Sequence, residues 1–323
     1  MNLKSLSDSI KAEAKRLGFF AVGIAKAEPV SETYAQQYRE SMERGDLADM
    51  GYLYEHIDMR LDPRLLMPGV KSIVSVALNY TPAMNLPKDS YHIAAYALGK
   101  DYHDVVKHKL WQLAEGIGLS EGFRCFVDTA PVLERYWAQQ AGMGWIGHNQ
   151  QLIIPNAGSM FFLGELFLAF ELDYDTPMSS QCGACHRCID ACPTHALSME
   201  TTDGNHDVSK EQACRFDARK CLSYQTIENR GDLSECAQQK IGNRIYGCDN
   251  CQQACPYNRQ APATTIPEFM PSQQLLDMKR TDWNNLTVQD YRALFKGSAV
   301  KRAKFDGLRR NIDAVIAYYK RHP

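Results

Sequence analysis

The sequence has no hydrophobic run long enough to cross a lipid bilayer. Its most apolar stretch, residues 160–170, is interrupted by Gly164 and Glu165, whereas a membrane-spanning helix needs about 20 mostly apolar residues in succession. The chain begins Met-Asn-Leu-Lys-Ser and shows no apolar segment of the kind that directs secretion. We therefore expect a cytoplasmic protein that does not contact a membrane.

The first half of the chain also lacks the motifs of common cofactor sites. Gly142, Gly144 and Gly147 surround Trp145, but a strand pattern follows them instead of a helix, so a Rossmann nucleotide site is not expected. The only cysteine before residue 180 is Cys125, which stands alone in a β pattern that is typical of a core position. Apart from two cysteine runs later in the chain, we find no internal repeat and no low-complexity tract.

Composition and periodicity predict a mixed α/β fold, of the α+β class. The chain has 323 residues, 45% hydrophobic and 23% charged, which is enough to bury a substantial core and to form two domains. Residue spacing predicts helices over 3–17, 31–44, 102–117 and 131–140, and strands over 19–25, 72–80, 123–127, 151–154 and 158–168. Pro131 is expected in the first turn of its helix. We divide the chain into an α/β domain (1–175), a cysteine-rich domain (176–262) and a helical segment (263–323).

The strongest motif is a run of four cysteines, Cys182, Cys185, Cys188 and Cys192, followed by Pro193. The spacing C-x2-C-x2-C-x3-C-P is that of bacterial ferredoxins, in which three thiolates bind one 4Fe–4S cluster and the fourth ligates the other cluster of a pair. One such run therefore predicts a second.

A second, incomplete run supplies Cys248, Cys251 and Cys255, with Ile245 where a leading cysteine would stand. The eighth thiolate must come from Cys214, Cys221 or Cys236. We choose Cys221 because Ala218-Arg-Lys-Cys-Leu-Ser223 is typical of a helix start that would hold the side chain rigidly. The predicted ligand sets are Cys182, Cys185 and Cys188 with Cys255, and Cys221, Cys248 and Cys251 with Cys192.

Two other uses of these cysteines are zinc binding and disulfide formation. Zinc sites often contain C-x2-C pairs, but they do not explain a third cysteine at the same spacing or the Cys-Pro that ends both runs. Disulfides require an oxidising compartment, which the expected location does not provide. Two 4Fe–4S clusters explain the whole pattern.

Two clusters transfer electrons but do not by themselves determine which reaction is catalysed. They must therefore deliver electrons to another centre in the protein. Because the first domain has no cysteine cluster, a bound organic cofactor is the natural destination, with a flavin or a corrin as the leading choices. The D-x-H-x-x-G signature of histidine-ligated cobalamin is absent, since Asp101-Tyr-His103-Asp-Val-Val106 lacks the glycine. The residues by themselves indicate a cluster-fed reductase.

Several motifs, taken in order along nearly the whole chain, closely resemble the epoxyqueuosine reductases. They are Val127-Asp128-Thr129, the Gly-Met-Gly-Trp-Ile-Gly turn with Asn149, Gly158-Ser159 with Gly164-Glu165, the first cysteine run, Arg219-Lys-Cys221-Leu-Ser223, and Ile241-Gly-Asn-Arg-Ile-Tyr-Gly-Cys248-Asp-Asn-Cys251. The resemblance implies a cobalamin-dependent, two-cluster enzyme that reduces epoxyqueuosine to queuosine at the wobble position of tRNA, with cob(II)alamin as the resting form. It also implies a first domain similar to the nitroreductase-related corrin-binding fold.

Asp128 is the residue we expect to donate the proton. Opening an epoxide to an alkene consumes two electrons, and the oxygen leaves as water only if protons are supplied. A carboxyl buried against a corrin face would have a raised pKa, as a general acid near neutral pH requires. The competing hypothesis is a helix N-cap. By resemblance, the corrin contacts are Asp128, Arg60, Leu152, Leu163, Ser223 and Asp249; for the two leucines, a core role is the alternative.

Two departures from the family pattern affect the predicted partners. His148 replaces a lysine that often follows the glycine-rich turn, and the helical-repeat tail of many members does not follow Arg309-Arg310-Asn311. From Lys279 onward, however, eleven basic residues stand against four acidic ones, a balance that suits a polyanion. The alternative is a solvated helix face. We expect a monomer that binds epoxyqueuosine-containing tRNA and an unidentified electron donor.

Other classes of protein fit the sequence less well. A corrinoid reductive dehalogenase would share the clusters and the corrin, but it is normally exported behind a signal segment. A simple electron carrier would not need the first domain, and a structural cluster protein that binds nucleic acid would not need Asp128.

Overall fold

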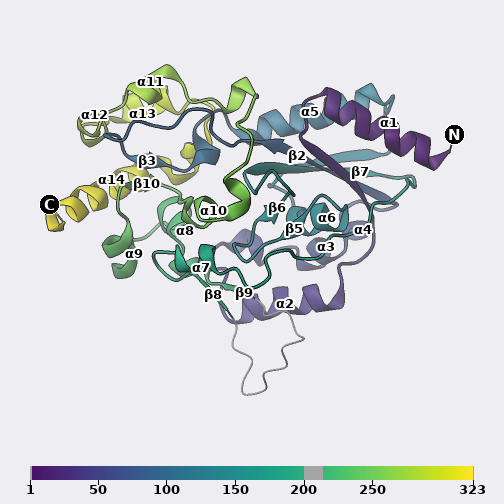
Figure 1. Cartoon of the computed structure of the whole chain (residues 1–323), viewed down its shortest axis with the longest axis horizontal. Coiled ribbons are helices and arrows are strands. Elements are labelled where there is room, and N and C mark those ends of the chain that lie inside the picture. Colours follow the sequence, from purple (N-terminus) through teal and green to yellow (C-terminus); the bar gives the residue numbers. More distant parts are fainter. Residues whose placement is uncertain (1, 200–213, 323) are drawn as a thin grey trace, which may run out of the picture.

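The computed structural model describes residues 2–199 and 214–322. Its centre is an antiparallel four-stranded sheet in the order β1-β2-β7-β4. The strands are β1 (Ala21–Lys26), β2 (Ser72–Asn79), β4 (Phe123–Phe126) and β7 (Phe161–Leu168). Every residue of β2 and β7 is buried, because helices cover both faces of the sheet (Figure 1).

One face of the sheet packs on α1 (Leu3–Arg16) and α5 (Tyr102–Gly116), with Ile10 and Leu110 among the shared core residues. The other face packs on α6 (Glu134–Gln140), and α2 (Glu32–Glu43), α3 (Ile57–Leu61) and α4 (Pro63–Leu66) complete this side. Two glycines permit close approach: a Cβ at Gly23 would lie 2.0 Å from the Ala141 carbonyl oxygen, and one at Gly164 would lie 2.7 Å from Val106 Cγ1.

The predicted cluster cysteines lie on or between short elements beside this sheet. These elements are β5 (Trp145–Ile146), β6 (Leu152–Ile153), α7 (Arg187–Asp190), β8 (Leu197–Met199), β9 (Cys214–Phe216), α8 (Leu222–Ile227), α9 (Glu235–Lys240) and α10 (Asn250–Gln253). The C-terminal helices are α11 (Gln273–Asp277), α12 (Arg280–Asn284), α13 (Val288–Leu294) and α14 (Lys304–Arg321). No helix in residues 2–199 or 214–322 has the length and apolar character needed to span a membrane.

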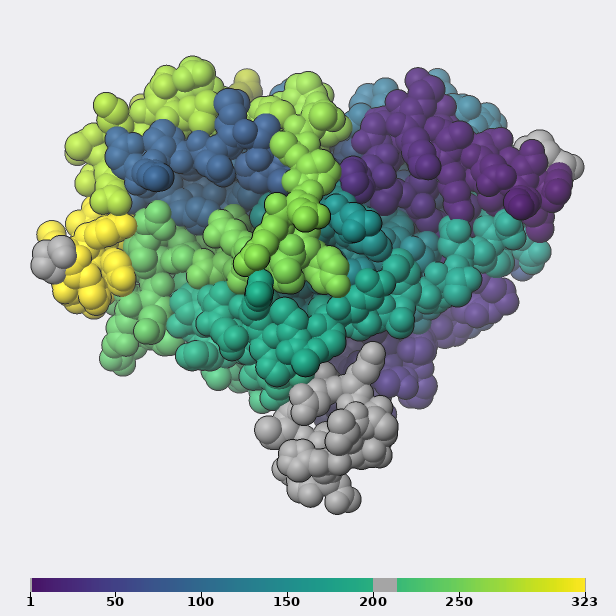
Figure 2. Space-filling model, viewed as in Figure 1, coloured from purple at the N-terminus to yellow at the C-terminus, as the bar shows by residue number. Residues whose placement is uncertain are grey.

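The C-terminal helices share a core with an early segment of the chain. β3 (His92–Ile93) pairs in parallel with β10 (Arg244–Tyr246), and Tyr91 and Leu98 pack in one apolar cluster with Trp283 and Ile312. In Figure 2 the blue segment near residue 90 lies against the yellow-green C-terminal residues, away from the N-terminus. The division at residues 175 and 262 remains a prediction, and the cores do not follow it exactly.

Most of the expected elements are present within a few residues of their predicted bounds. The exception is the helix expected over 131–140, because α6 begins at Glu134 and Pro131 lies outside it. The preceding residues form tight bends instead, in which Thr129 N–H donates to the Val127 carbonyl and Val132 N–H donates to that of Ala130. The predicted helix start after Cys221 is confirmed, since Cys221 is the N-cap residue of α8.

Candidate active site and cluster cysteines

The eight predicted cluster ligands lie on separate segments of the chain, and none of them forms a disulfide. Burial raises the pKa of Cys188 to about 12, and nearby Cys214, Cys182 and Cys255 add to the shift. In the same way, burial raises the pKa of Cys221 to about 11, with contributions from Cys248 and Cys192. The neighbours of Cys221 belong to its own predicted ligand set, whereas those of Cys188 include Cys214, which lies outside both sets. These thiols would be neutral without a cluster, whose iron stabilises the thiolate form.

Hydrogen-bond donors approach two of these sulfur atoms. Trp145 is fully buried, and its Nε1 lies 3.5 Å from Cys182 Sγ. The Ala196 N–H donates to Cys192 Sγ over 3.2 Å. N–H groups directed at cysteine sulfurs are typical of iron–sulfur sites, where they influence the reduction potential.

The two cysteines rejected as the eighth ligand have different surroundings. Cys214 donates its thiol hydrogen to the His148 carbonyl over 3.0 Å, and Cys236 is exposed on α9. The side chain of His148, which departs from the family pattern, lies beside the first cysteine run: its Nδ1 is 3.0 Å from the Cys185 carbonyl oxygen.

Asp128 follows β4 and is held by two side chains from the start of α5. The Tyr102 hydroxyl donates to Asp128 Oδ2 over 2.5 Å, and His103 Nε2 lies 3.2 Å from the same oxygen. On its other side, His103 Nδ1 lies 2.6 Å from Oδ1 of Asp101, the residue that caps α5. The Asp128 side chain is still 56% exposed, so its carboxyl is both fixed and accessible.

The electrostatics of this group differ from the expectation. Burial acts to raise the pKa of Asp128, but hydrogen bonds from His103 and Tyr102 outweigh it, so the pKa lies below its ordinary value. Burial likewise acts to lower the pKa of His103, but the bonds to Asp101 and Asp128 raise it to about 9. In this arrangement the proton therefore resides on His103 at neutral pH, and the raised pKa expected for Asp128 against a corrin face stays a prediction.

The alternative role of Asp128 as a helix N-cap is wrong. The N-cap residue of α6 is Leu133, and no side chain caps that helix. Asp128 instead has a left-handed backbone, with φ of 50°, and its N–H donates to Glu134 Oε1 over 2.5 Å.

The other predicted cofactor contacts fall into two places. Arg60 is buried on α3 and donates to the Tyr52 carbonyl over 2.9 Å, while its Nε has no partner among the described residues. Leu152 and Leu163 pack with Phe126 in the sheet core, as the core alternative expects.

Ser223 and Asp249 lie together in the cysteine-rich part. The Ser223 hydroxyl is 3.5 Å from the Cys248 carbonyl oxygen. Asp249 is buried and accepts a hydrogen bond from Ala95 N–H over 2.8 Å. It also lines a cleft of about 420 Å³ between residues 81–98 and 243–259.

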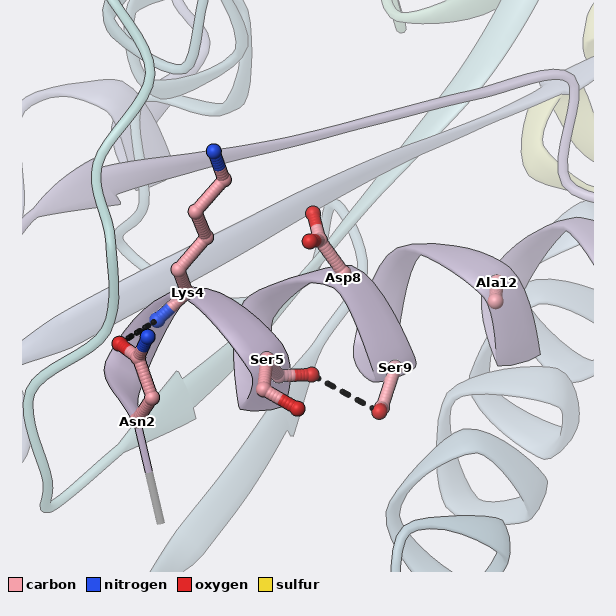
Figure 3. Close-up of a pocket in the computed structure, with 6 residues that line it drawn as sticks. All are labelled: Asn2, Lys4, Ser5, Asp8, Ser9 and Ala12. Carbon is pink, nitrogen blue, oxygen red and sulfur yellow. Dashed lines mark hydrogen bonds between the residues drawn. The ribbon is translucent and has the colours of Figure 1, made fainter.

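A further hollow, of about 470 Å³, lies along one face of α1 (Figure 3). Its hydrogen bonds, Lys4 N–H to Asn2 and the Ser9 hydroxyl to the Ser5 carbonyl, stay within the helix and its cap. The side chains drawn in Figure 3 do not converge on a common point. This hollow contributes nothing to the site around Asp128.

The C-terminal segment uses two of its arginines for packing. Arg310 donates to the carbonyl oxygens of Gln225, Asn229 and Gly231. Arg309 donates to the Asn284 carbonyl and to Asp313. Both guanidinium groups therefore hold α14 against its neighbours, so they are poor candidates for phosphate contacts. Arg292, Lys296, Lys301 and Lys304 are exposed and are better ones.

Sequence reasoning missed several members of the acid site: Asp101, Tyr102, His103, Glu134 and Glu165. Asp101 and His103 were considered only as part of an incomplete corrin motif. Their position at the start of an amphipathic helix, beside a tyrosine, is a signal that could have identified them. Glu134 offered no such signal, because acidic residues are common in the first turn of a helix.

Comparisons with known proteins agree with this arrangement. Residues 60–129 match the family described as epoxyqueuosine reductase QueG, DUF1730, and residues 181–258 match a 4Fe–4S double cluster binding domain. An epoxyqueuosine reductase of Cellulophaga algicola is 42% identical over 97% of this chain and 99% of its own length. That of Escherichia coli strain K12 is 36% identical over 94% of this chain and 78% of its own length.

Solved structures give the same result. A crystal structure of epoxyqueuosine reductase with an epoxyqueuosine-modified tRNA stem loop has a TM-score of 0.87 and 28% identity, covering 99% of this chain and 83% of that one. The Bacillus subtilis enzyme, with its catalytic loop swung out of the active site, has a TM-score of 0.85 and 26% identity over the same shares. With relatives this similar over nearly its whole length, the chain belongs to the epoxyqueuosine reductase family of oxidoreductases.

Proposed function

We propose that this enzyme reduces epoxyqueuosine to queuosine at the wobble position of tRNA, with Asp128 as the group that passes a proton to the departing oxygen. The eight cysteines would hold two 4Fe–4S clusters, which would supply electrons from an unidentified donor to a cobalamin with cob(II)alamin as its resting form. The observation that carries this proposal is the accessible carboxyl of Asp128, held by Tyr102 and His103, in a molecule whose later part carries the eight predicted cluster ligands as free cysteines.

Unpartnered buried donors support a cofactor with many amide groups. Among the described residues, Arg60 Nε and Asn149 Nδ2 are both buried without a hydrogen-bond partner, and cobalamin carries carbonyl oxygens around its ring that could accept from them. Ser223 and Asp249 would contact the corrin from the cysteine-rich part, beside the second cluster. When bound, cobalamin supplies a cobalt centre that can be reduced to a strong nucleophile toward a strained ring carbon.

The chain's own residues handle the proton. Reduction of the epoxide to the alkene takes two electrons and two protons and releases water. His103 holds a proton at neutral pH and contacts Asp128, so the pair titrates as a unit. Once the substrate covers Asp128 and removes water from it, desolvation raises its affinity for the proton. Asp128 then delivers that proton to the oxygen, and the pair takes up the second proton from solvent through His103.

Several finer features belong to the same proposal. The first domain has the nitroreductase-related fold, and the chain acts as a cytoplasmic monomer. The tRNA approaches the exposed basic residues of the C-terminal segment, where Arg292, Lys296 and Lys301 are available.

The test is to replace Asp128 with asparagine in the cluster- and cobalamin-loaded enzyme. The amide keeps the size and can still accept from Tyr102, but it cannot pass a proton. We expect turnover of epoxyqueuosine-containing tRNA to fall by about 10²- to 10⁴-fold, with iron content and the corrin absorption band unchanged after gel filtration. Turnover within a few-fold of the parent, in a sample that holds its corrin, would show that the proton comes from elsewhere.

A further inference from the structure

The proposed reaction leaves two glutamates near Asp128 without a role, and the first is Glu165. It lies in β7, opposite Ser75 on β2 and Phe126 on β4. Side chains two residues apart in a strand share a face, so Glu165 points to the same side as Leu163 and Phe167, the side that α6 covers. Glu165 is fully buried, and neither carboxyl oxygen has a hydrogen-bond partner in the described structure.

A charged carboxylate in this layer would be strongly unfavourable. Burial raises the pKa of Glu165 well above its usual range, and the neighbouring carboxyl groups of Glu134 and Asp128 raise it further. Glu165 is therefore neutral at physiological pH. The layer behind the Asp128 turn is apolar, and it favours the neutral form of any carboxyl that faces it.

Glu134, the first residue of α6, contacts Asp128 directly. Its Oε1 accepts the Asp128 N–H over 2.5 Å. Burial raises the pKa of Glu134 to about 8, and the charge of Asp128 contributes; the Asp128 N–H, Arg135 and His103 act in the opposite direction. At neutral pH Glu134 is therefore mostly protonated, and its carbonyl oxygen can still accept the hydrogen bond.

The backbone at Asp128 needs such a contact. Its φ of 50° lies in the left-handed region, which a non-glycine residue occupies stably only where its surroundings hold it there. The two side chains from α5 fix the Asp128 carboxyl, and Glu134 fixes its peptide N–H. The turn is thus held at two points from two different helices.

We propose that Glu134 is a positioning residue that fastens the Asp128 turn by accepting the Asp128 peptide N–H. The titratable and charged groups that face it are Asp128 in the turn, His103 from α5, Arg135 on α6 and Glu165 from β7. A neutral and a charged carboxyl can both accept this hydrogen bond, so the contact persists when Glu134 titrates. The catalytic consequence rests on the proposed role of Asp128, but the fastening of the turn does not.

The experiment compares Glu134→Gln, Glu134→Ala and, as a control, Glu115→Ala, which alters an exposed glutamate on α5. Amide hydrogen exchange of residues 127–133 is followed between pH 6 and 9 in the cluster-loaded enzyme without substrate, after correction for the intrinsic effect of pH. In parallel, kcat and KM for epoxyqueuosine-containing tRNA are measured over the same range with the cobalamin-loaded enzyme.

We expect the Asp128 turn of Glu134→Ala to exchange about tenfold faster than that of the parent at every pH, the effect of one lost hydrogen bond, and its kcat to fall while KM changes little. Glu134→Gln, whose amide oxygen can still accept, keeps slow exchange and near-parent kcat. The control behaves as the parent.

Two results would overturn the proposal: exchange in Glu134→Ala equal to that of the control, or Glu134→Gln behaving like Glu134→Ala at neutral pH. Faster exchange with unchanged kcat would support the fastening of the turn and argue against the proposed role of Asp128. The two proposals are thus tested separately.

Discussion

The cysteine-rich part and the acid site around Asp128 are assembled in different ways. Most cluster ligands come from two short runs, within residues 182–192 and 248–255, so local spacing specifies them. The acid site takes Tyr102 and His103 from α5, Asp128 from the end of β4, and Glu134 from α6. A binding motif that is defined by residue spacing can be recognised in a sequence. A site whose residues come from separate helices and strands can be recognised only in the fold.

The largest effect should come from Cys221, the one ligand outside both runs. We expect Cys221→Ala to lose about half of its iron, because one of two clusters lacks a ligand, and to lose turnover. Cys236→Ala, which alters an exposed thiol, is the matched control and should keep both. Iron per chain and turnover are measured for these two variants and for Cys214→Ala. Half the iron missing from Cys214→Ala, with Cys221→Ala intact, would contradict the assignment.

Removing His103 tests whether the acid site works as an assembly. We expect His103→Asn to lower kcat by about tenfold or more, less than the roughly 10²- to 10⁴-fold loss expected for the acid itself. The pKa of His103 is raised from 6.5 to about 9. The imidazolium contact is therefore complete below pH 6.5 and is lost as the pH rises through about 9.

The parent kcat should accordingly decline around pH 9, and the variant should lack that decline. Epoxyqueuosine-containing tRNA serves as the substrate in both profiles. The same alkaline decline in His103→Asn would assign it to another group.

A smaller effect, on stability, should distinguish the C-terminal arginines that pack against carbonyl groups from those that are exposed. Arg310→Ala leaves three carbonyl groups without their donor, so we expect about 1–3 kcal/mol less stability, seen as a lower thermal midpoint. The free energy of unfolding of Arg292→Ala should stay within about 0.5 kcal/mol of the parent value.

The same variant tests tRNA binding. If Arg292 contacts a phosphate, its loss reduces the slope of log affinity for tRNA against log salt by about 0.7–0.9. An unchanged slope would show that Arg292 lies on a solvated helix face and does not contact a phosphate.

The smallest effect concerns Trp145. Its indole N–H approaches Cys182 Sγ, and a donor at a cluster sulfur stabilises the reduced, more negative cluster. We expect Trp145→Phe to lower the reduction potential of the first cluster and to leave iron content unchanged. Trp283→Phe removes an equally buried indole, one that donates to Ser90. This variant should not change the reduction potential of the first cluster. Redox titration followed by electron paramagnetic resonance measures both, and equal potentials would exclude a tuning role.

Much of the fold could be predicted from the sequence because amphipathic periodicity and strand patterns are local. The predicted start of α6 is three residues too early because Pro131 is compatible with the first turn of a helix. In the structure the helix begins at Glu134, whose side chain accepts the Asp128 N–H, and the residues between them form a bend. The low pKa of Asp128 could not be predicted, since it depends on two side chains that lie about 25 positions earlier in the chain.

The packing role of Arg309 and Arg310 could not be predicted from the sequence for a similar reason. A count of charges reveals the excess of basic residues from Lys279 onward, but it does not reveal which of them meet carbonyl groups. Arg310 reaches carbonyl oxygens about 80 positions earlier. Only the fold separates the arginines that hold helices together from those that face solvent.

The parallel pairing of β3 with β10 has a consequence for synthesis of the protein. His92 leaves the ribosome about 150 residues before its partner Arg244, which at 5–20 residues per second is on the order of 10 s. Until then, Tyr91, Ile93 and Leu98 lack the C-terminal side chains that bury them. A nascent or truncated chain that ends near residue 175 would therefore expose an apolar surface, and it would depend on chaperones until the last helices arrive.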